Sequence, residues 1–239
     1  ILVHDRLYDA FERRAAELVG AFRQGSSRDG IVDVGAIITP LQLDIIEKAV
    51  DGAIAQGARV VTGGKRSLCD AGDYFEPTIL ADVTPDMDIA REEVFGPVML
   101  LMRFHDDDEA TKIANDVSYG LSSSIFSKDR GRARKIATEL ETGMCAINEF
   151  GGITYMAQDL TFGGVKESGF GRMNGREGLR SMCNIKAVVD DRFPINQPNK
   201  MYPVTPKQYG TFGGVIDLVY GRGFKQRWQG FLKILGIGR

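Results

Sequence analysis

The stretch "PVMLLMRFHDDDEATKIAND", residues 97–116, decides which fold class the sequence favours. Residues 97–104 form an apolar run of strand length, which is typical of a strand covered on both faces. Residues 106–116 are expected to form a helix, whose first acidic side chains would cap free amides and meet the positive end of its dipole. A divalent-metal cluster is the alternative for "HDDDEA", residues 105–110, but no further ligand spacing of a calcium loop follows.

On both sides of this stretch, expected strands alternate with expected helices. Further helices are predicted from Arg6 to about Phe22, from Pro40 behind an N-capping Thr39, and over residues 129–141. Further strands or extended segments are predicted at residues 58–64, 74–80, 122–127 and 143–148. This alternation predicts an α/β fold, a mainly parallel sheet with helical crossovers. The opening "ILVH" already has strand character, and we expect the chain to be a piece of a longer protein.

The composition narrows the classes of function. The 239 residues are 43% hydrophobic and 26% charged, with a net charge of −2, so nothing favours a nucleic-acid partner. Three cysteines without CxxC spacing and two histidines predict neither a metal site nor a disulfide framework. A reducing, cytoplasmic location fits best. No apolar run reaches the length of a membrane span, and no signal peptide opens the chain.

The amino-acid composition changes near the carboxyl end of the chain. Residues 190–210 hold four of the eight prolines and are expected to form an extended, irregular connector. Residues 215–235 mix apolar and basic side chains and predict two short amphipathic helices. Such a tail could dock on protein or lie on a membrane surface, and its composition does not choose between them.

The segment "TFGGVKESGFGR", residues 161–172, has four glycines and two cations and suggests a phosphate loop. It lacks the GxxxxGK[ST] pattern, and a dinucleotide fingerprint would need glycine where Asn174 stands. We therefore interpret it as a turn in which backbone passes close to backbone. None of the three cysteines resembles a nucleophile: Cys145 is expected to be a buried inert thiol, Cys69 an exposed unassisted one, and Cys183 part of a helix.

The segment "AREEVFGPVML", residues 90–100, leaves two interpretations open. The two glutamates could be a solvated pair before a turn. Alternatively, Glu93 could lie at the edge of a sheet crevice and accept hydrogen bonds from sugar hydroxyls.

Three ordered segments carry a resemblance to a known family. They are "YFEPTILADVTPDMDIAREEVFGPV", "IANDVSYGLSSSIFSKD" and "INEFGGITYMAQDLTFGGVKESGFGR". Together they resemble the carboxyl-terminal half of the NAD(P)-dependent aldehyde dehydrogenases, over Ile1 to about Asp191, and most closely the plant and fungal membrane-associated branch. The resemblance implies an incomplete catalytic domain at 1–172, a helix and oligomerisation strand at 173–192, and a connector with an amphipathic tail at 193–239.

The resemblance also implies a chemistry. An activated cysteine attacks an aldehyde, hydride passes to NAD or NADP, and a thioester is hydrolysed to the carboxylic acid. The segment with that cysteine would precede the stretch matching "ILVHDRLYDAF", so we expect no catalytic residue here and an inactive fragment. Glu93 matches the glutamate that holds the nicotinamide ribose, Phe95 the aromatic beside the ring, and Phe162 the aromatic that lines the substrate tunnel.

The resemblance has departures and competitors. Thr161 stands where the family usually has proline, which should loosen the turn, and Met173 replaces a common glutamate, which puts one structural salt bridge in doubt. Residues 186–191 match a strand that joins a neighbouring subunit, which implies a homo-oligomer, a dimer or tetramer. The branch implies association of the full-length protein with the endoplasmic reticulum membrane. A non-catalytic assembly or scaffold protein is the competing function, and a related acyl-phosphate reductase fits less well because it lacks this motif spacing.

Overall fold

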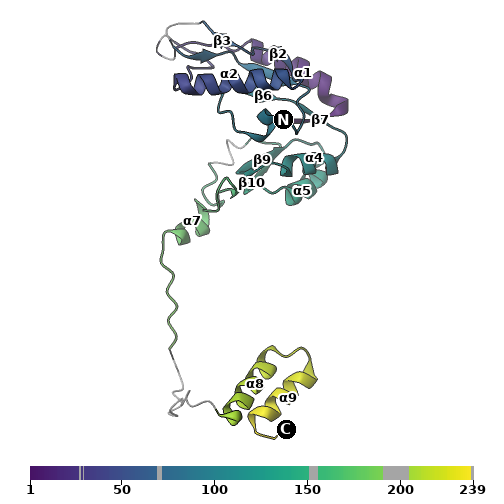
Figure 1. Ribbon diagram of the computed structural model, residues 1–239, viewed down its shortest axis with the longest axis vertical. Coiled ribbons are helices and arrows are strands. Elements are labelled where there is room, and N and C mark those ends of the chain that lie inside the picture. Colours follow the sequence, from purple (N-terminus) through teal and green to yellow (C-terminus); the bar gives the residue numbers. More distant parts are fainter. Residues whose placement is uncertain (27, 29, 69–71, 151–155, 191–204, 238–239) are drawn as a thin grey trace. The chain divides into compact units, whose positions relative to one another are not determined.

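The computed structural model describes residues 1–26, 28, 30–68, 72–150, 156–190 and 205–237 (Figure 1). The chain divides into two compact units, Ile1–Ile185 and Lys186–Arg239, which are described separately. The domain boundaries expected from the sequence stay predictions.

The first unit has six described helices, and not all of them begin behind a capping side chain. They are α1 (Asp5–Gly20), α2 (Pro40–Ala55), α3 (Asp88–Arg91), α4 (Asp107–Asn115), α5 (Arg130–Glu139) and α7 (Gly175–Ser181). The side chains of Thr39, Asp106 and Asp129 accept hydrogen bonds from amides in the first turns of α2, α4 and α5. Asp106 therefore caps a helix, which confirms the capping interpretation of residues 105–110.

The strands are short and their pairing is mixed. They are β1 (Leu2–His4), β2 (Arg59–Thr62), β3 (Arg66–Ser67), β4 (Tyr74–Phe75), β5 (Thr78–Ala81), β6 (Val98–Leu100), β7 (Met102–Phe104), β8 (Tyr119–Gly120), β9 (Ser122–Ile125), β10 (Met144–Ile147) and β11 (Val165–Lys166). The pairs β1–β7, β5–β6 and β9–β10 are parallel, whereas β2–β5, β3–β4 and β8–β11 are antiparallel. The predicted α/β class is confirmed, with antiparallel additions.

The apolar run at residues 97–104 is two strands rather than the single one expected. Strand β6 pairs with β5, and β7 pairs with β1. At the break, the Leu101 amide donates to the Leu80 carbonyl at 2.8 Å, and the Leu101 carbonyl accepts from the Tyr8 hydroxyl at 3.1 Å. Leu101 thus leaves the β5 ladder at its carbonyl, which accepts from the Tyr8 side chain of α1 and from the Val83 amide, while its own side chain is fully buried.

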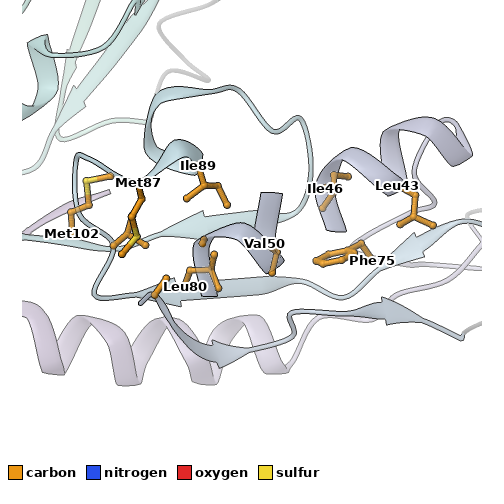
Figure 2. Close-up of a cluster of buried hydrophobic side chains, with 11 residues drawn as sticks. Leu43, Ile46, Val50, Phe75, Leu80, Met87, Ile89 and Met102 are labelled. Atoms are coloured by element: carbon orange, nitrogen blue, oxygen red, sulfur yellow. The ribbon is translucent and has the colours of Figure 1, made fainter. Parts of the chain in front are cut away.

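The core of the first unit lies on both faces of β5. Leu80 points into a cluster that Figure 2 shows with Leu43, Ile46 and Val50 of α2. The adjacent residues Ile79 and Ala81 belong to a second cluster, which contains Tyr8 and Ala15 of α1. Successive side chains of a strand point to opposite faces, so α1 and α2 cover the two sides of this strand.

The second unit is a pair of helices, α8 (Pro206–Tyr220) and α9 (Phe224–Ile234). Two helices were expected over residues 215–235, but α8 begins earlier, inside the stretch expected to be an irregular connector. Thr205 and Gln208 form a capping box, with Pro206 in the first turn of α8. No helix among the described residues is long and apolar enough to cross a membrane.

The oligomerisation strand expected at residues 186–191 stays a prediction, because the structure contains a single chain. Residues 184–190 adopt neither helix nor strand, and Val188 and Val189 are 79% and 94% exposed. A lone segment has no ladder to join, so strand structure there needs a partner chain. Asp191 and the connector up to residue 204 lie outside the described residues.

Candidate functional site

The loop between α3 and β6 carries Glu93 and Phe95, and two packed elements hold its backbone. Gln42 of α2 donates from Nε2 to the Val94 carbonyl at 2.7 Å. A Cβ added to Gly96 would come within 2.7 Å of the Ile46 side chain, so the loop lies directly against α2. The Pro97 carbonyl accepts from the amide of Thr78 in β5 at 2.8 Å. The loop is thereby tied to α2 and β5.

Val94 of this loop packs against the core cluster, but the side chains of Glu93 and Phe95 are not used by the fold. Glu93 is exposed, and no described residue pairs with its carboxylate. Phe95 is 77% exposed and has a φ of 46°, a left-handed conformation that a bulky residue seldom adopts. A strained backbone that presents an apolar ring to solvent is typical of a binding site. Both side chains are therefore free to contact a bound molecule, and the ribose and nicotinamide roles that the resemblance implies for them stay predictions.

Phe162 lies in a different segment, the glycine-rich turn. Its amide donates to the Met173 carbonyl at 2.8 Å, and the Met173 amide donates back at 2.7 Å. This isolated antiparallel bridge closes the two ends of the turn and leaves Phe162 half-buried. Met173, which replaces a common glutamate, therefore contributes through its backbone. Glu93 and Phe95 share one loop, and Phe162 belongs to another.

The close backbone contact interpreted from the sequence holds for Gly163 and Gly164 of the turn, and also for Gly143 before β10, whereas a Cβ added to Gly169 or Gly171 would meet nothing within 4 Å. A Cβ at Gly143 would collide with the carbonyl oxygen of Gly163, and one at Gly163 would collide with that of Gly171. A Cβ at Gly164 would lie 2.6 Å from the Cβ of Ser168. Any side chain larger than hydrogen would force the main chain apart at these positions.

The two cationic side chains of the turn, Lys166 and Arg172, donate hydrogen bonds to backbone carbonyl oxygens. The Lys166 Nζ donates to Asn115 at 2.7 Å and Val117 at 3.1 Å, at the carboxyl end of α4, where a positive charge is stabilised by the helix dipole. The Arg172 guanidinium donates to Gly164 at 2.6 Å and Gly171 at 2.8 Å. The two cations hold the turn together, which supports the rejection of a phosphate site.

Thr161, expected to loosen the turn, ties it to the next helix. Its hydroxyl donates to Glu177 in the first turn of α7 at 2.9 Å. This hydrogen bond lowers the pKa of the Glu177 carboxyl below its ordinary value. A proline could not make this contact, so the substitution adds an anchor between the turn and α7.

The two described cysteines differ from their expected positions, Cys145 in its burial and Cys183 in its place relative to the helix. Cys145 in β10 is partly rather than fully buried, because the short β9–β10 pair covers it incompletely, and its Sγ lies 3.9 Å from the Ala146 carbonyl. Cys183 follows α7 instead of lying within it and is exposed. Cys69 lies outside the described residues.

A hollow that the sequence did not indicate lies where four strands end. His4, Phe104 and Ile125 are the last residues of β1, β7 and β9, and Asn148 follows β10. Ligands often bind at such strand ends. Here, however, Asn148 exchanges two hydrogen bonds with the Ser127 backbone, at 2.8 and 2.9 Å. Asp107 of α4 forms an ion pair with Arg132 of α5. These polar groups join neighbouring elements and do not make a second site.

The chain was compared with known proteins. The family model of the "Aldehyde dehydrogenase family" matches residues 1–188. An aldehyde dehydrogenase-like protein of Schizosaccharomyces pombe is 37% identical over 230 residues, which are 92% of this chain and 44% of that protein. Succinate-semialdehyde dehydrogenase [NADP(+)] of Deinococcus radiodurans is 41% identical over 197 residues, covering 82% of this chain and 40% of that protein.

The solved structures agree with the sequence matches. The crystal structure of betaine aldehyde dehydrogenase from Staphylococcus aureus in complex with NAD+ superposes with a TM-score of 0.70 at 37% identity. The superposition covers 76% of this chain and 36% of that chain. The chain therefore spans less than half the length of the relatives it matches. With a family model over its first 188 residues and relatives of this identity, the chain belongs to the aldehyde dehydrogenase family.

Proposed function

We propose that the full-length protein oxidises an aldehyde to a carboxylic acid with NAD or NADP, and that this chain supplies part of the cofactor and substrate sites. The observation that carries the proposal is the loop of Glu93 and Phe95, whose backbone is held by α2 and β5 while both side chains face solvent. A cytoplasmic homo-oligomer that acts on a small-molecule aldehyde is part of the same proposal.

The role of Glu93 follows from its chemistry. An ionised carboxylate accepts short hydrogen bonds from hydroxyl groups, and two vicinal ribose hydroxyls match its two oxygens. NAD(P)+, when bound, accepts the hydride that leaves the aldehyde carbon. Glu93 holds the ribose, and the Phe95 ring limits the movement of the neighbouring heterocycle. Because the loop is held by Gln42 and packs against Ile46, binding of the cofactor costs little further conformational entropy of the loop backbone.

Phe162 acts on the substrate side of this proposal. The bridge to Met173 and the glycine contacts fix the backbone from which its ring projects. A rigidly placed aromatic wall favours an apolar aldehyde and excludes water from the reacting carbonyl. The cysteine nucleophile belongs to a segment that, by the family resemblance, precedes the residues of this chain.

Replacing Glu93 with glutamine in the full-length protein should slow hydride transfer without unfolding the protein. Losing a charge-assisted hydrogen bond costs about 1.5–3 kcal/mol, which corresponds to roughly 10- to 150-fold. Single-turnover NADH formation over a cofactor titration measures the loss. Glu92→Gln is the matched control, because Glu92 is the adjacent exposed glutamate and makes the same charge change. Equal rates for the two variants would contradict the assigned role.

The 239-residue chain by itself should produce no NADH from NAD+ and a panel of aldehydes. Covalent catalysis requires an activated thiolate, and neither Cys145 nor Cys183 has a described cation or histidine beside its sulfur. The absorbance of NADH is compared with buffer alone. A protein-dependent burst that Cys145→Ser or Cys69→Ser abolishes would show that the chain carries its own nucleophile. A full-length protein that assembles but has no activity would instead favour the scaffold function.

A further inference from the structure

The helices of the second unit meet through glycines rather than through apolar side chains. A Cβ added to Gly214 of α8 would lie 2.7 Å from the Gly230 carbonyl oxygen, and one added to Gly230 of α9 would lie 2.6 Å from that of Gly214. These two glycines are the buried described residues of the helices themselves. The backbones therefore touch, and the large side chains are directed outward.

The outward side chains form an apolar face on each helix. On α8, side chains at helical spacing are 54–80% exposed; they are Tyr209, Phe212, Ile216, Val219 and Tyr220. On α9, the corresponding residues are 40–82% exposed; they are Phe224, Trp228, Phe231 and Leu235. The ring of Trp228 stacks on Phe224 at 6.2 Å and on Phe231 at 5.6 Å, which makes a continuous aromatic surface. When the apolar side chains of two paired helices face water, packing of the two helices removes little apolar surface from water. Such a pair is stabilised when an apolar environment covers these side chains.

The charge of this region identifies the kind of environment. Residues 192–239 contain eight of the 30 lysines and arginines and one of the 32 acidic residues, a net charge of +7, whereas residues 1–191 carry −9. The single acid, Asp217, accepts from Lys233 at 2.7 Å and from Gln226 at 3.2 Å. Arg222 and Lys225 remain exposed at the start of α9, beside the aromatic surface. Aromatic rings flanked by basic side chains are the composition of a helix at an anionic lipid surface.

The lengths of the helices fit the interface of a bilayer rather than its full thickness. At 15 and 11 residues, α8 and α9 are about 22 and 17 Å long, compared with about 30 Å for the hydrocarbon core. We propose that the pair α8–α9 is a membrane-interface hairpin, which lays its aromatic surface into a bilayer containing anionic phospholipid.

The single tryptophan of the chain makes the proposal directly measurable, because Trp228 lies on the proposed lipid-facing surface. The 239-residue chain is mixed with vesicles of phosphatidylcholine alone or of phosphatidylcholine with phosphatidylserine. We expect a blue shift of the fluorescence, quenching by brominated acyl chains and co-sedimentation, all much stronger with phosphatidylserine and weakened by salt. Emission that stays the same with anionic vesicles overturns the proposal. Emission that is already blue without lipid also overturns it, because Trp228 would then be covered by protein.

Charge-neutralising variants distinguish membrane binding by α8 and α9 from nonspecific electrostatic adsorption of the rest of the chain. Arg222→Gln with Lys225→Gln should weaken partitioning onto anionic vesicles about 30-fold, at about 1 kcal/mol for each cation near the surface. Arg13→Gln with Lys48→Gln removes two exposed cations of the first unit and should leave partitioning unchanged. A second variant, Trp228→Ser with Phe224→Ser, should abolish co-sedimentation while the far-ultraviolet circular dichroism is retained. Equal binding by all the variants would show that the hairpin does not make the contact.

Discussion

Gly143→Ala is expected to lower the free energy of unfolding of the first unit by about 3 kcal/mol, the upper range for overpacking. The Gly143 amide donates to the Gly120 carbonyl at 3.0 Å, so one side of the residue is fixed to β8. Its other side lies against Gly163, whose carbonyl oxygen occupies the space that a methyl group would need. The obstacle is main chain rather than a flexible side chain, so relief requires the glycine-rich turn to move away from β10.

Gly171→Ala is the matched control for this prediction. Gly171 lies in the same turn, but an added Cβ would meet nothing within 4 Å. It should change stability by less than about 1 kcal/mol, because a loop alanine also restricts the unfolded chain. Urea unfolding of the two variants, followed by circular dichroism, compares the midpoints. Equal midpoints would mean that the close backbone contact is not what requires glycine at position 143.

Local chemistry explains why much of the fold was predictable. Thr39 and Asp106 are capping residues placed directly before helical patterns, and each caps its helix as expected. Asp129, expected as the first residue of a helix, caps α5 in the same way. Such signals are read from a few neighbouring residues, so no knowledge of the tertiary structure is needed. Likewise, the missing GxxxxGK[ST] pattern was enough to reject a phosphate loop around Lys166.

What could not be predicted depends on contacts between distant residues. The break at Leu101 arises because Leu80 and Tyr8, 21 and 93 positions away in the chain, satisfy its backbone. The short pair β8–β11 joins segments 45 residues apart, and neither strand has a pattern of its own. The positive φ of Phe95 is set by the packing of its loop on α2, which no local rule contains. Glu93 itself was ambiguous from its pattern, and only the family resemblance gave it a role.

Truncating the full-length protein after Cys183 is expected to convert the oligomer into smaller species. Residues 184–190 carry Ile185, Val188 and Val189, which are 79–94% exposed and adopt no secondary structure in the single chain. An extended apolar segment with unpaired backbone groups gains a ladder and buried area when it adds to the sheet of another subunit. In the resembled family the matching strand makes this contact, so its removal deletes the shared edge of the interface.

A second truncation distinguishes this strand from the helical hairpin that follows it. Stopping the chain after Asp191 keeps residues 184–191 but removes the connector, α8 and α9. We expect light scattering to give the intact oligomer mass for this variant, and half or less of it for the truncation after Cys183. Loss of the oligomer in both variants would assign assembly to the hairpin, and an unchanged mass in both would show that the strand serves its own subunit. Because the exposed valines have no partner strand among the residues that the structure describes, the expected outcome is loss in the shorter variant alone.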